Sequence, residues 1–237
     1  MALIQMGPNI TGIRNSVAGQ TFSQNKGGAY TKAKPIPTNP RTAAQQLVRA
    51  NFAANSKQWS GALTDAERAA WTFFAQNNPY TNVFGQSKQL SGMSMMMKLN
   101  QVLTQIGEDF LPVAPSDLSV PTLATATGLQ ATLDGGNNWD TFVVDTDAQT
   151  VVAGAKYYVF ATPFLAAGKS AGQSDYRWLG AVAAVAAATS FDIQALWEAV
   201  FGTLTKSGGH VSVLVATVNV DTGALTPALV FDTGILT

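Results

Sequence analysis

Leu111-Pro112-Val113-Ala114-Pro115 divides the 237-residue chain into two parts with different sequence patterns. Before this stretch, apolar residues recur at helical spacing, and after it short runs of alternating or β-branched residues recur between turn residues. We therefore predict an α+β, multidomain chain with four segments. They are an extended arm (1–39), a three-helix segment (40–110), a linker (111–117), and an antiparallel β-sandwich of immunoglobulin or fibronectin type (118–237).

Capping signals and apolar stripes predict three helices in residues 40–110. The first runs from Pro40 to about Gln58, with Asn39 as N-cap and proline at the first helical position. Its apolar stripe is Leu47, Val48, Phe52 and Trp59.

The second predicted helix, about Asp65 to Gln76, opens on a capping box between Thr64 and Glu67. Its predicted inward residues are Ala66, Ala70, Phe73 and Phe74. The third helix runs from Ser91 to Ile106 and stops at Gly107. Its methionine-rich stripe and the side chains of Trp59 and Trp71 are expected to fill a small three-helix core.

Short β-type runs recur at the spacing of a sandwich with seven or eight strands. A helical turn is predicted over 195–201, between two of these runs. The expected strands are 118–123, 129–133, 139–144, 157–162, 178–182, 189–193, 211–218 and 225–231.

Charge is distributed unevenly along the chain, although the net charge is zero. From Met1 to Lys57 the chain contains seven Lys or Arg and no Asp or Glu. Residues 1–112 hold 10 Lys or Arg against 4 acids, a net charge of +6, and residues 113–237 hold 4 against 10, a net charge of −6. Such an asymmetry is typical of a protein that docks through one end.

Residues 1–39 contain no lasting helical or strand pattern, and their isolated apolar side chains cannot bury enough surface to fold alone. One interpretation is a disordered tail. The spacing of the apolar residues favours an arm that becomes ordered on a neighbouring subunit, by strand addition or by filling a groove. The residues expected to position or anchor it are Arg14, Phe22, Lys26, Tyr30, Lys32, Lys34, Ile36 and Arg41.

The expected partner is an acidic protein surface. Phosphate groups also attract lysine and arginine, but these cations are dispersed from Arg14 to Lys57 and no recognised nucleic-acid-binding motif accompanies them. Only 12% of the residues are charged and 46% are hydrophobic, which suits surfaces buried in an assembly. Self-association is expected too, because an arm that cannot fold alone tends to be shared with a neighbour.

Composition excludes several classes of protein. The chain has no cysteine, which excludes disulfides and thiolate metal sites. Its longest apolar run, Ala181–Ala188, has eight residues, whereas a membrane-spanning helix needs about 20. The first residues lack the cationic start and apolar core of a secretory signal, so a soluble chain is expected.

Asp-Thr-Gly occurs twice, at Asp221 and Asp232. In aspartic proteases, two such loops bring two carboxylates together to share a proton. Here both copies lie near the end of the chain, too close in sequence to belong to two separate lobes. A hairpin turn explains the first copy better.

Metal and cofactor chemistry is not predicted either. The carboxylates of Asp134, Asp140, Asp145 and Asp147 could bind calcium, but they lack the spacing of an EF-hand. The single histidine, His210, is expected at the surface. We predict that the chain is not an enzyme and has no catalytic residue, metal site or cofactor.

The segment 1–110 resembles a family of proteins encoded by tailed bacteriophages and prophage-like regions, whose members are taken to be virion structural proteins. The second half, with Tyr158-Val159-Phe160-Ala161-Thr162-Pro163 and Gly168, resembles the variable fibronectin-like domain that often follows. The residues that carry the first resemblance are Gly19–Tyr30, Pro37–Thr42, Gln45, Gln46, Arg49, Trp59, Leu63, Thr64, Arg68, Ala70, Trp71 and Leu90–Gly92.

The resemblance and the charge asymmetry together predict a virion structural protein. A capsid decoration or cement protein is favoured, with the major capsid protein or another virion protein as partner and no membrane. A tail-, connector- or fibre-associated protein is the alternative. A carbohydrate- or cell-surface-binding module is a further alternative, resting on Trp139, Trp178 and Trp197, which are more typical of a core.

Overall fold

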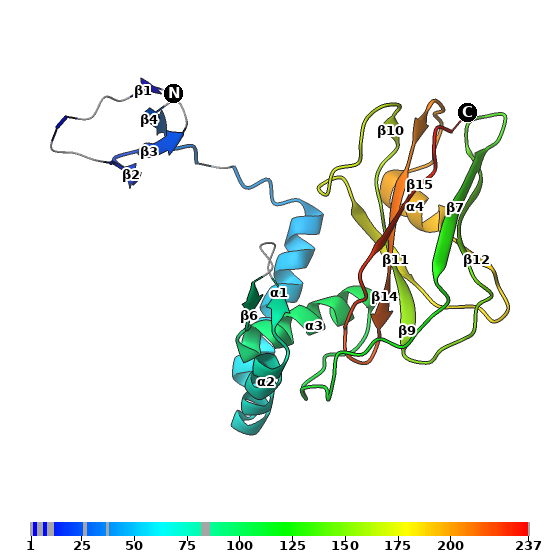
Figure 1. Ribbon diagram of the computed structural model, residues 1–237, viewed down its shortest axis with the longest axis horizontal. Helices are drawn as coiled ribbons and strands as arrows, with labels where there is room; N and C mark the ends of the chain where they lie inside the picture. Colours follow the sequence, from blue (N-terminus) through cyan, green and yellow to red (C-terminus); the bar gives the residue numbers. More distant parts are fainter. Residues whose placement is uncertain are drawn as a thin grey trace. The chain divides into compact units, whose positions relative to one another are not determined.

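The computed structural model describes residues 2–3, 7–8, 12–25, 28–36, 38–81 and 86–236. The chain divides into two compact units, residues 1–46 and residues 47–237, and each is considered by itself. The fold is mixed α+β, with helices in the first half and antiparallel sheets in the second, as the sequence predicted (Figure 1). Among the described residues, no helix is long and apolar enough to cross a membrane.

The first unit contains a four-stranded antiparallel sheet, named here the N-terminal sheet, in the order β1-β4-β3-β2. Its strands are β1 (Ala2–Leu3), β2 (Asn15–Val17), β3 (Gln20–Asn25) and β4 (Gly28–Ala33). The sequence predicted no strands here, and the reason is visible in the turn between β2 and β3. Ala18 and Gly19 both have positive φ, 48° and 78°, as a two-residue hairpin turn requires, but alanine is not a turn-forming residue in sequence.

Three helices open the second unit: α1 (Ala43–Gly61, which begins in the first unit), α2 (Asp65–Asn77) and α3 (Gly92–Ile106). A two-stranded sheet, β5 (Tyr80–Thr81) with β6 (Ser87–Lys88), precedes α3. The helix α1 starts at Ala43 instead of Pro40, because the backbone at Arg41 has a positive φ of 49°. Thr42 precedes the helix, and its Oγ1 accepts a hydrogen bond from Gln45 N–H at 3.3 Å.

The predicted caps of α2 and α3 are confirmed. Thr64 and Glu67 form the capping box, and the hydrogen bonds from the backbone and side chain of Thr64 lower the pKa of the Glu67 carboxyl. The helix α3 ends at Gly107 in the left-handed conformation. Between the helices, the core contains the fully buried Trp71, and Trp59 packs against it partly buried. The methionines Met95, Met96 and Met97 are buried core residues in this cluster, as predicted.

The rest of the second unit, named here the two-sheet region, comprises residues 118–236. Its two main sheets have the orders β12-β8-β7 and β11-β9-β14-β15, and β10 pairs with β13 in a small third sheet; all pairings are antiparallel. The strands and helix are β7 (Ala126–Leu133), β8 (Trp139–Thr146), β9 (Ala155–Ala161), β10 (Leu165–Ala166), β11 (Arg177–Val182), β12 (Ser190–Asp192), α4 (Gln194–Phe201), β13 (Gly209–His210), β14 (Ser212–Asn219) and β15 (Leu229–Asp232).

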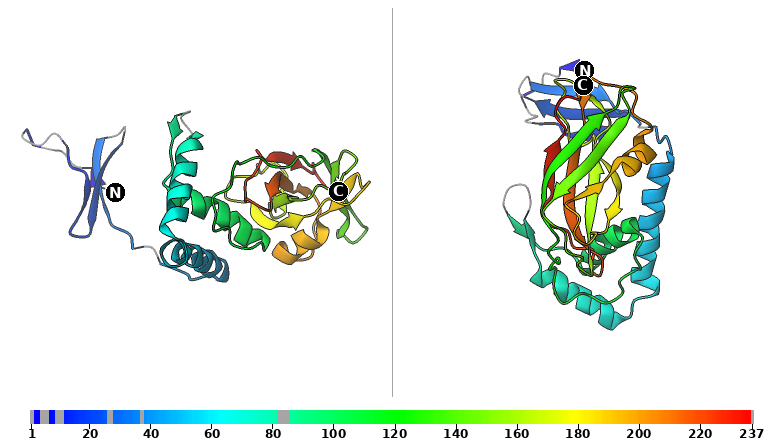
Figure 2. Two further views of the ribbon diagram at one scale, coloured as in Figure 1. Left: turned by 90° about the horizontal axis from the view of Figure 1, so that it is seen from below. Right: turned by 90° about the vertical axis from the view of Figure 1, so that its right-hand side faces the viewer.

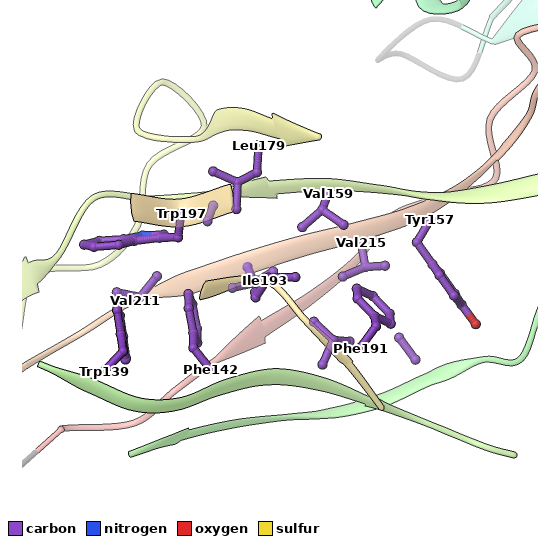
Figure 3. Packing of buried hydrophobic residues seen from close by; sticks show 14 of the residues in the cluster. Trp139, Phe142, Tyr157, Val159, Leu179, Phe191, Ile193, Trp197, Val211 and Val215 are labelled. Atoms are coloured by element: carbon purple, nitrogen blue, oxygen red, sulfur yellow. The ribbon is translucent and has the colours of Figure 1, made fainter. Parts of the chain in front are cut away.

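Most of the predicted strands coincide with observed ones, and the predicted helical turn is α4. The exception is 118–123, which forms no strand. Figure 3 shows the core between the two sheets, where Phe142 of β8 lies on the side opposite Val159 and Val215 of the other sheet. Val144 of β8 is buried in the same cluster. Trp197 of α4 is part of the same core, and its indole N–H donates to the carbonyl of Thr162 at 3.0 Å.

The helix α3 packs on the outer face of the β11-β9-β14-β15 sheet. Val102 and Ile106 of α3 lie against a buried cluster that includes Tyr158 and Val218. Two polar contacts join the same surfaces: the Tyr158 hydroxyl donates to Gln105 Oε1 at 2.5 Å, and Lys156 Nζ lies 2.8 Å from Glu108 Oε1. Figure 2 shows α3 (green) reaching from the other helices to this sheet.

The predicted linker, residues 111–117, is tied to the helical core at its start. The buried Asn100 of α3 binds Leu111 in both directions: its Nδ2 donates to the carbonyl at 3.2 Å, and its Oδ1 accepts from the N–H at 2.6 Å. The carbonyl of Pro112 accepts the indole N–H of Trp71 at 2.8 Å. This part of the chain is therefore integral to the helical core.

Alkaline pH is expected to weaken the contact between α3 and the sheet. Burial raises the pKa of the Tyr158 hydroxyl to about 12. The stability that this shift contributes is fully present below the unfolded pKa near 10 and is lost as the pH rises toward 12, about 1.4 kcal/mol of it by pH 11. Urea unfolding at about pH 9 and pH 11 measures the loss. Tyr158→Phe should lose less stability over that interval, and an equal loss in both proteins would contradict the assignment.

Candidate partner interface

The N-terminal sheet is a single layer without a core of its own. Among residues 7–46, no side chain that the structure describes is buried. A sheet is normally stable only when at least one face packs against another layer. The described part of the first unit therefore lacks the layer that would cover its sheet.

The two faces of this sheet differ in chemistry. Antiparallel pairing places Phe22 opposite Thr31 and Asn15, and alternation puts Val17 on the same face. The other face carries Tyr30 and Lys32 beside hydroxyl residues. Those hydroxyl residues are Ser16, Thr21 and Ser23. One face is thus mixed apolar and the other is polar and cationic.

The predicted partner-binding residues are distributed over both faces and over the segment that follows. Phe22 and Tyr30 lie on opposite faces of the sheet and are each half-buried. Ile36, after β4, is 90% exposed. Arg14, Lys32, Lys34 and Arg41 are exposed or half-buried, and Lys26 lies outside the described residues.

The first unit has a charge of one sign. It holds five Lys or Arg (Arg14, Lys26, Lys32, Lys34 and Arg41) and no Asp or Glu, whereas residues 47–237 hold 9 Lys or Arg against 14 acids, a net charge of −5. No cation of the first unit can therefore be neutralised by a carboxylate side chain of that unit. Its electrostatic field favours an acidic partner.

The helix α1 exposes the first half of its apolar stripe. Leu47, Val48 and Phe52 are 62%, 61% and 55% exposed, so this part of the predicted apolar stripe faces solvent. The helix buries only Asn55 among its described residues; Asn55 Nδ2 donates to Gln101 Oε1 of α3 at 3.1 Å. The exposed residues precede this contact, where an apolar helix face is open to a partner.

The helix α2 departs from its prediction in a similar way. Phe74 is buried, whereas Phe73 is 68% exposed and Ala66 and Ala70 are exposed. Successive helical residues point about 100° apart, so adjacent phenylalanines cannot both face one narrow core. Phe73 adds an aromatic side chain to the exposed apolar surface of the helices.

The two Asp-Thr-Gly copies are not brought together. Asp232 is the pairing partner of Ser212 at the start of β14, and Asp221 follows Asn219 at the end of that strand. An eight-residue strand is about 27 Å long, so the two carboxylates cannot share a proton. In the first copy, Asn219 Oδ1 accepts the backbone N–H groups of Asp221 and Thr222, at 2.8 and 3.2 Å, which forms a turn.

His210 is largely buried, and the prediction that it lies at the surface was wrong. Its side chain is 12% exposed, and its Nε2 lies 3.6 Å from Asp232 Oδ2 because β13 and β15 flank the same groove. The nearby Ser212 is 3% exposed as a residue, and its Oγ donates to the carbonyl of Phe231 at 3.1 Å, so it is not positioned as a nucleophile.

Metal ligands and an aromatic sugar platform were also sought. No group of three or more His, Asp or Glu gathers to hold a metal ion in the described part of the chain. Trp139 and Trp197 are buried in the two-sheet core, as predicted, and Trp178 is half-buried beside Tyr158. Buried indoles cannot stack on a sugar ring, so Trp139 and Trp197 do not support the carbohydrate-binding alternative, which is left with the half-buried Trp178.

No protein-family model, curated protein or solved structure matches this chain.

Proposed function

We propose that the chain is a structural protein of a tailed-bacteriophage virion, a capsid decoration or cement protein. In this proposal the N-terminal sheet and the helices dock on acidic capsid subunits, and the two-sheet region, an immunoglobulin- or fibronectin-like sandwich, projects from the particle. The observation that carries the proposal is the uncovered, acid-free N-terminal sheet, which has no buried described side chain and five cations in its unit.

Docking would supply a layer that covers the N-terminal sheet and acidic groups that neutralise its cations. A partner that covers the apolar face would remove Phe22 and Val17 from water, and acidic groups would neutralise Lys32 and Lys34. The exposed apolar stripe of α1 would also be removed from water by such a partner. Dispersed lysines and arginines without base-stacking motifs favour a protein surface over nucleic acid as partner.

Copy number in the purified virion tests the proposal. Quantitative mass spectrometry of particles should give a ratio to the major capsid protein near one, or a simple lattice fraction. A ratio of a few per hundred would assign the chain to the tail, connector or fibre instead. Absence from the particle would overturn the proposal altogether.

Phe52→Gln is expected to weaken capsid binding without destabilising the protein. The side chain is 55% exposed in the free chain, so the change in the free energy of unfolding should stay within about 0.5 kcal/mol. Burying a phenylalanine on a partner is worth about 1.5–3 kcal/mol, so affinity for purified capsids should fall about tenfold or more.

The matched control for this variant is Val185→Gln in the two-sheet region, where the native side chain is 63% exposed. It introduces the same amide on a surface that the proposal leaves free, and capsid co-sedimentation should be unchanged. Equal loss of binding in both variants would argue against α1 as part of the interface.

A further inference from the structure

The outer face of the β12-β8-β7 sheet carries carboxylates and no cation. Phe142 and Val144 point into the core, and alternation places Asp145 on the outer side. Trp139 also lies in the core, because a β-bulge between Trp139 and Thr141 interrupts the alternation and leaves Asp140 on the outer side beside Thr132. Asp192 joins them from β12. The three strands contain no Lys, Arg or His. This surface, which we name the acidic face, also carries uncharged residues. They are Gln130 and Thr132 of β7, Thr141 and Val143 of β8, and Ser190 of β12.

The carboxylates of the acidic face are held in place by neutral groups. Gln130 Nε2 donates to Asp145 Oδ1 at 3.0 Å, and Thr132 Oγ1 lies 3.3 Å from Asp140 Oδ2. Asp192 Oδ1 accepts the backbone N–H of Gln194 at 2.7 Å. Among the described residues, none of the three carboxylates belongs to an ion pair. The face therefore presents three uncompensated negative charges.

This face is also the open side of the two-sheet region. The helix α3 covers the other sheet, against Tyr158 and Val218, and Figure 1 shows β7 and β12 on the side opposite α3. Asp140 and Asp192 are exposed, and Asp145 is half-buried. An exposed sheet face with fixed carboxylates is suited to a flat, cationic surface.

The N-terminal sheet is a surface of that kind. Its cationic face carries Lys32 among hydroxyl residues and Tyr30, Arg14 precedes β2, and Lys34 follows β4. The first unit has no Asp or Glu, and the second has a net charge of −5. Every copy of the chain thus carries one cationic sheet that lacks a covering layer and one acidic sheet face, in equal numbers.

We propose that the cationic face of the N-terminal sheet of one copy docks on the acidic face of a second copy. The contact is heterologous, so repeating it produces rings or open arrays instead of a closed two-fold dimer. The four strands are two, three, six and six residues long. At about 3.3 Å per residue and 4.8 Å between strands they cover roughly 270 Å² per partner, below the size of most specific interfaces, so the association is expected to be weak. The proposal does not depend on the virion, because it concerns the purified chain alone.

Complementation between two variants tests the proposal. The first, Arg14→Gln/Lys32→Gln/Lys34→Gln, removes cations from the N-terminal sheet. The second, Asp140→Asn/Asp145→Asn/Asp192→Asn, removes the charges of the acidic face and keeps each side-chain oxygen as a hydrogen-bond acceptor. Sedimentation velocity at about 200 μM and low salt should show concentration-dependent assembly of the wild-type chain, at least tenfold weaker association for each variant alone, and loss of wild-type assembly in about 1 M salt.

Mixing the two variants should restore association but limit it to 1:1 dimers, since one intact cationic face then meets one intact acidic face. A control variant with the same charge change elsewhere, Asp109→Asn/Glu198→Gln/Asp221→Asn, should assemble as the wild type does. A monomeric wild-type chain would overturn the proposal, as would undiminished assembly of either variant or a mixture that stays monomeric. A copy bound to a capsid would use Lys32 and Lys34 there, so capsid binding is measured separately. A monomeric purified chain overturns the present proposal and leaves the capsid proposal unaffected.

Discussion

Gly223→Ala is expected to destabilise the protein by about 3 kcal/mol, a value within the summed range of two costs. Gly223 has a φ of +74°, which costs an L-residue roughly 1–2 kcal/mol. A Cβ atom added there would lie 2.3 Å from the carbonyl oxygen of Leu99 in α3, so the turn or the helix must move, at a further cost of about 1–3 kcal/mol. The turn packs on the helix only because this position has no side chain.

The second Asp-Thr-Gly copy supplies the control. Gly234 has nearly the same backbone conformation, with a φ of +68°, but nothing lies within 4 Å of the position of an added Cβ. Gly234→Ala should cost only about 1–2 kcal/mol. Thermal unfolding should show a melting temperature lowered by roughly 6–12 °C for Gly223→Ala and by a few degrees for Gly234→Ala. Equal changes in melting temperature would mean that an added Cβ at residue 223 does not collide with α3.

Trp71→Ala should be similarly damaging, by about 3–5 kcal/mol, the usual cost of removing a large buried aromatic side chain. Trp71 is fully buried, packs edge-to-face with Phe74 at 6.0 Å, and donates its indole N–H to the carbonyl of Pro112. Its removal would leave a cavity in the helical core and a carbonyl without its donor. Denaturant unfolding measures the loss.

Phe73→Ala, on the same helix, is the matched control for Trp71→Ala. Its ring is 68% exposed, so the free energy of unfolding should change by no more than about 0.5 kcal/mol. Trp71→Phe separates packing from hydrogen bonding, because it fills most of the space and removes the donor; a loss of about 1–3 kcal/mol is expected. A Phe73→Ala variant as unstable as Trp71→Ala would contradict the assigned orientations.

Short sequence motifs correctly predicted those elements that are fixed by interactions between residues close together in the sequence. The Thr64–Glu67 capping box and Gly107 each involve residues within one turn, so the ends of α2 and α3 could be read directly. The β-branched and aromatic residues of 139–144 likewise predicted β8. The turn at Ala18-Gly19 has no such signal, because its positive φ at alanine is held by the pairing of β2 with β3.

The candidate interface depended more on long-range packing. The sequence showed which face of α1 is apolar but not how much of that face the rest of the unit covers. Phe52 is exposed, whereas Asn55 is buried. The acidic face was not predicted at all. Asp192 joins Asp145 through pairing of β12 with β8, two strands that β9, β10 and β11 separate in sequence.

The anchoring of α3 on the β11-β9-β14-β15 sheet has a practical consequence for dissecting the chain. A fragment that starts at residue 118 would retain both sheets but lose α3, and with it the cover over Tyr158, Ala216 and Val218. Its newly bare hydrophobic strip would promote aggregation. A fragment that starts at residue 47 instead follows the boundary between the two compact units. It loses only the first turn of α1 and keeps α3 on the sheet, so we expect this fragment to be the soluble one.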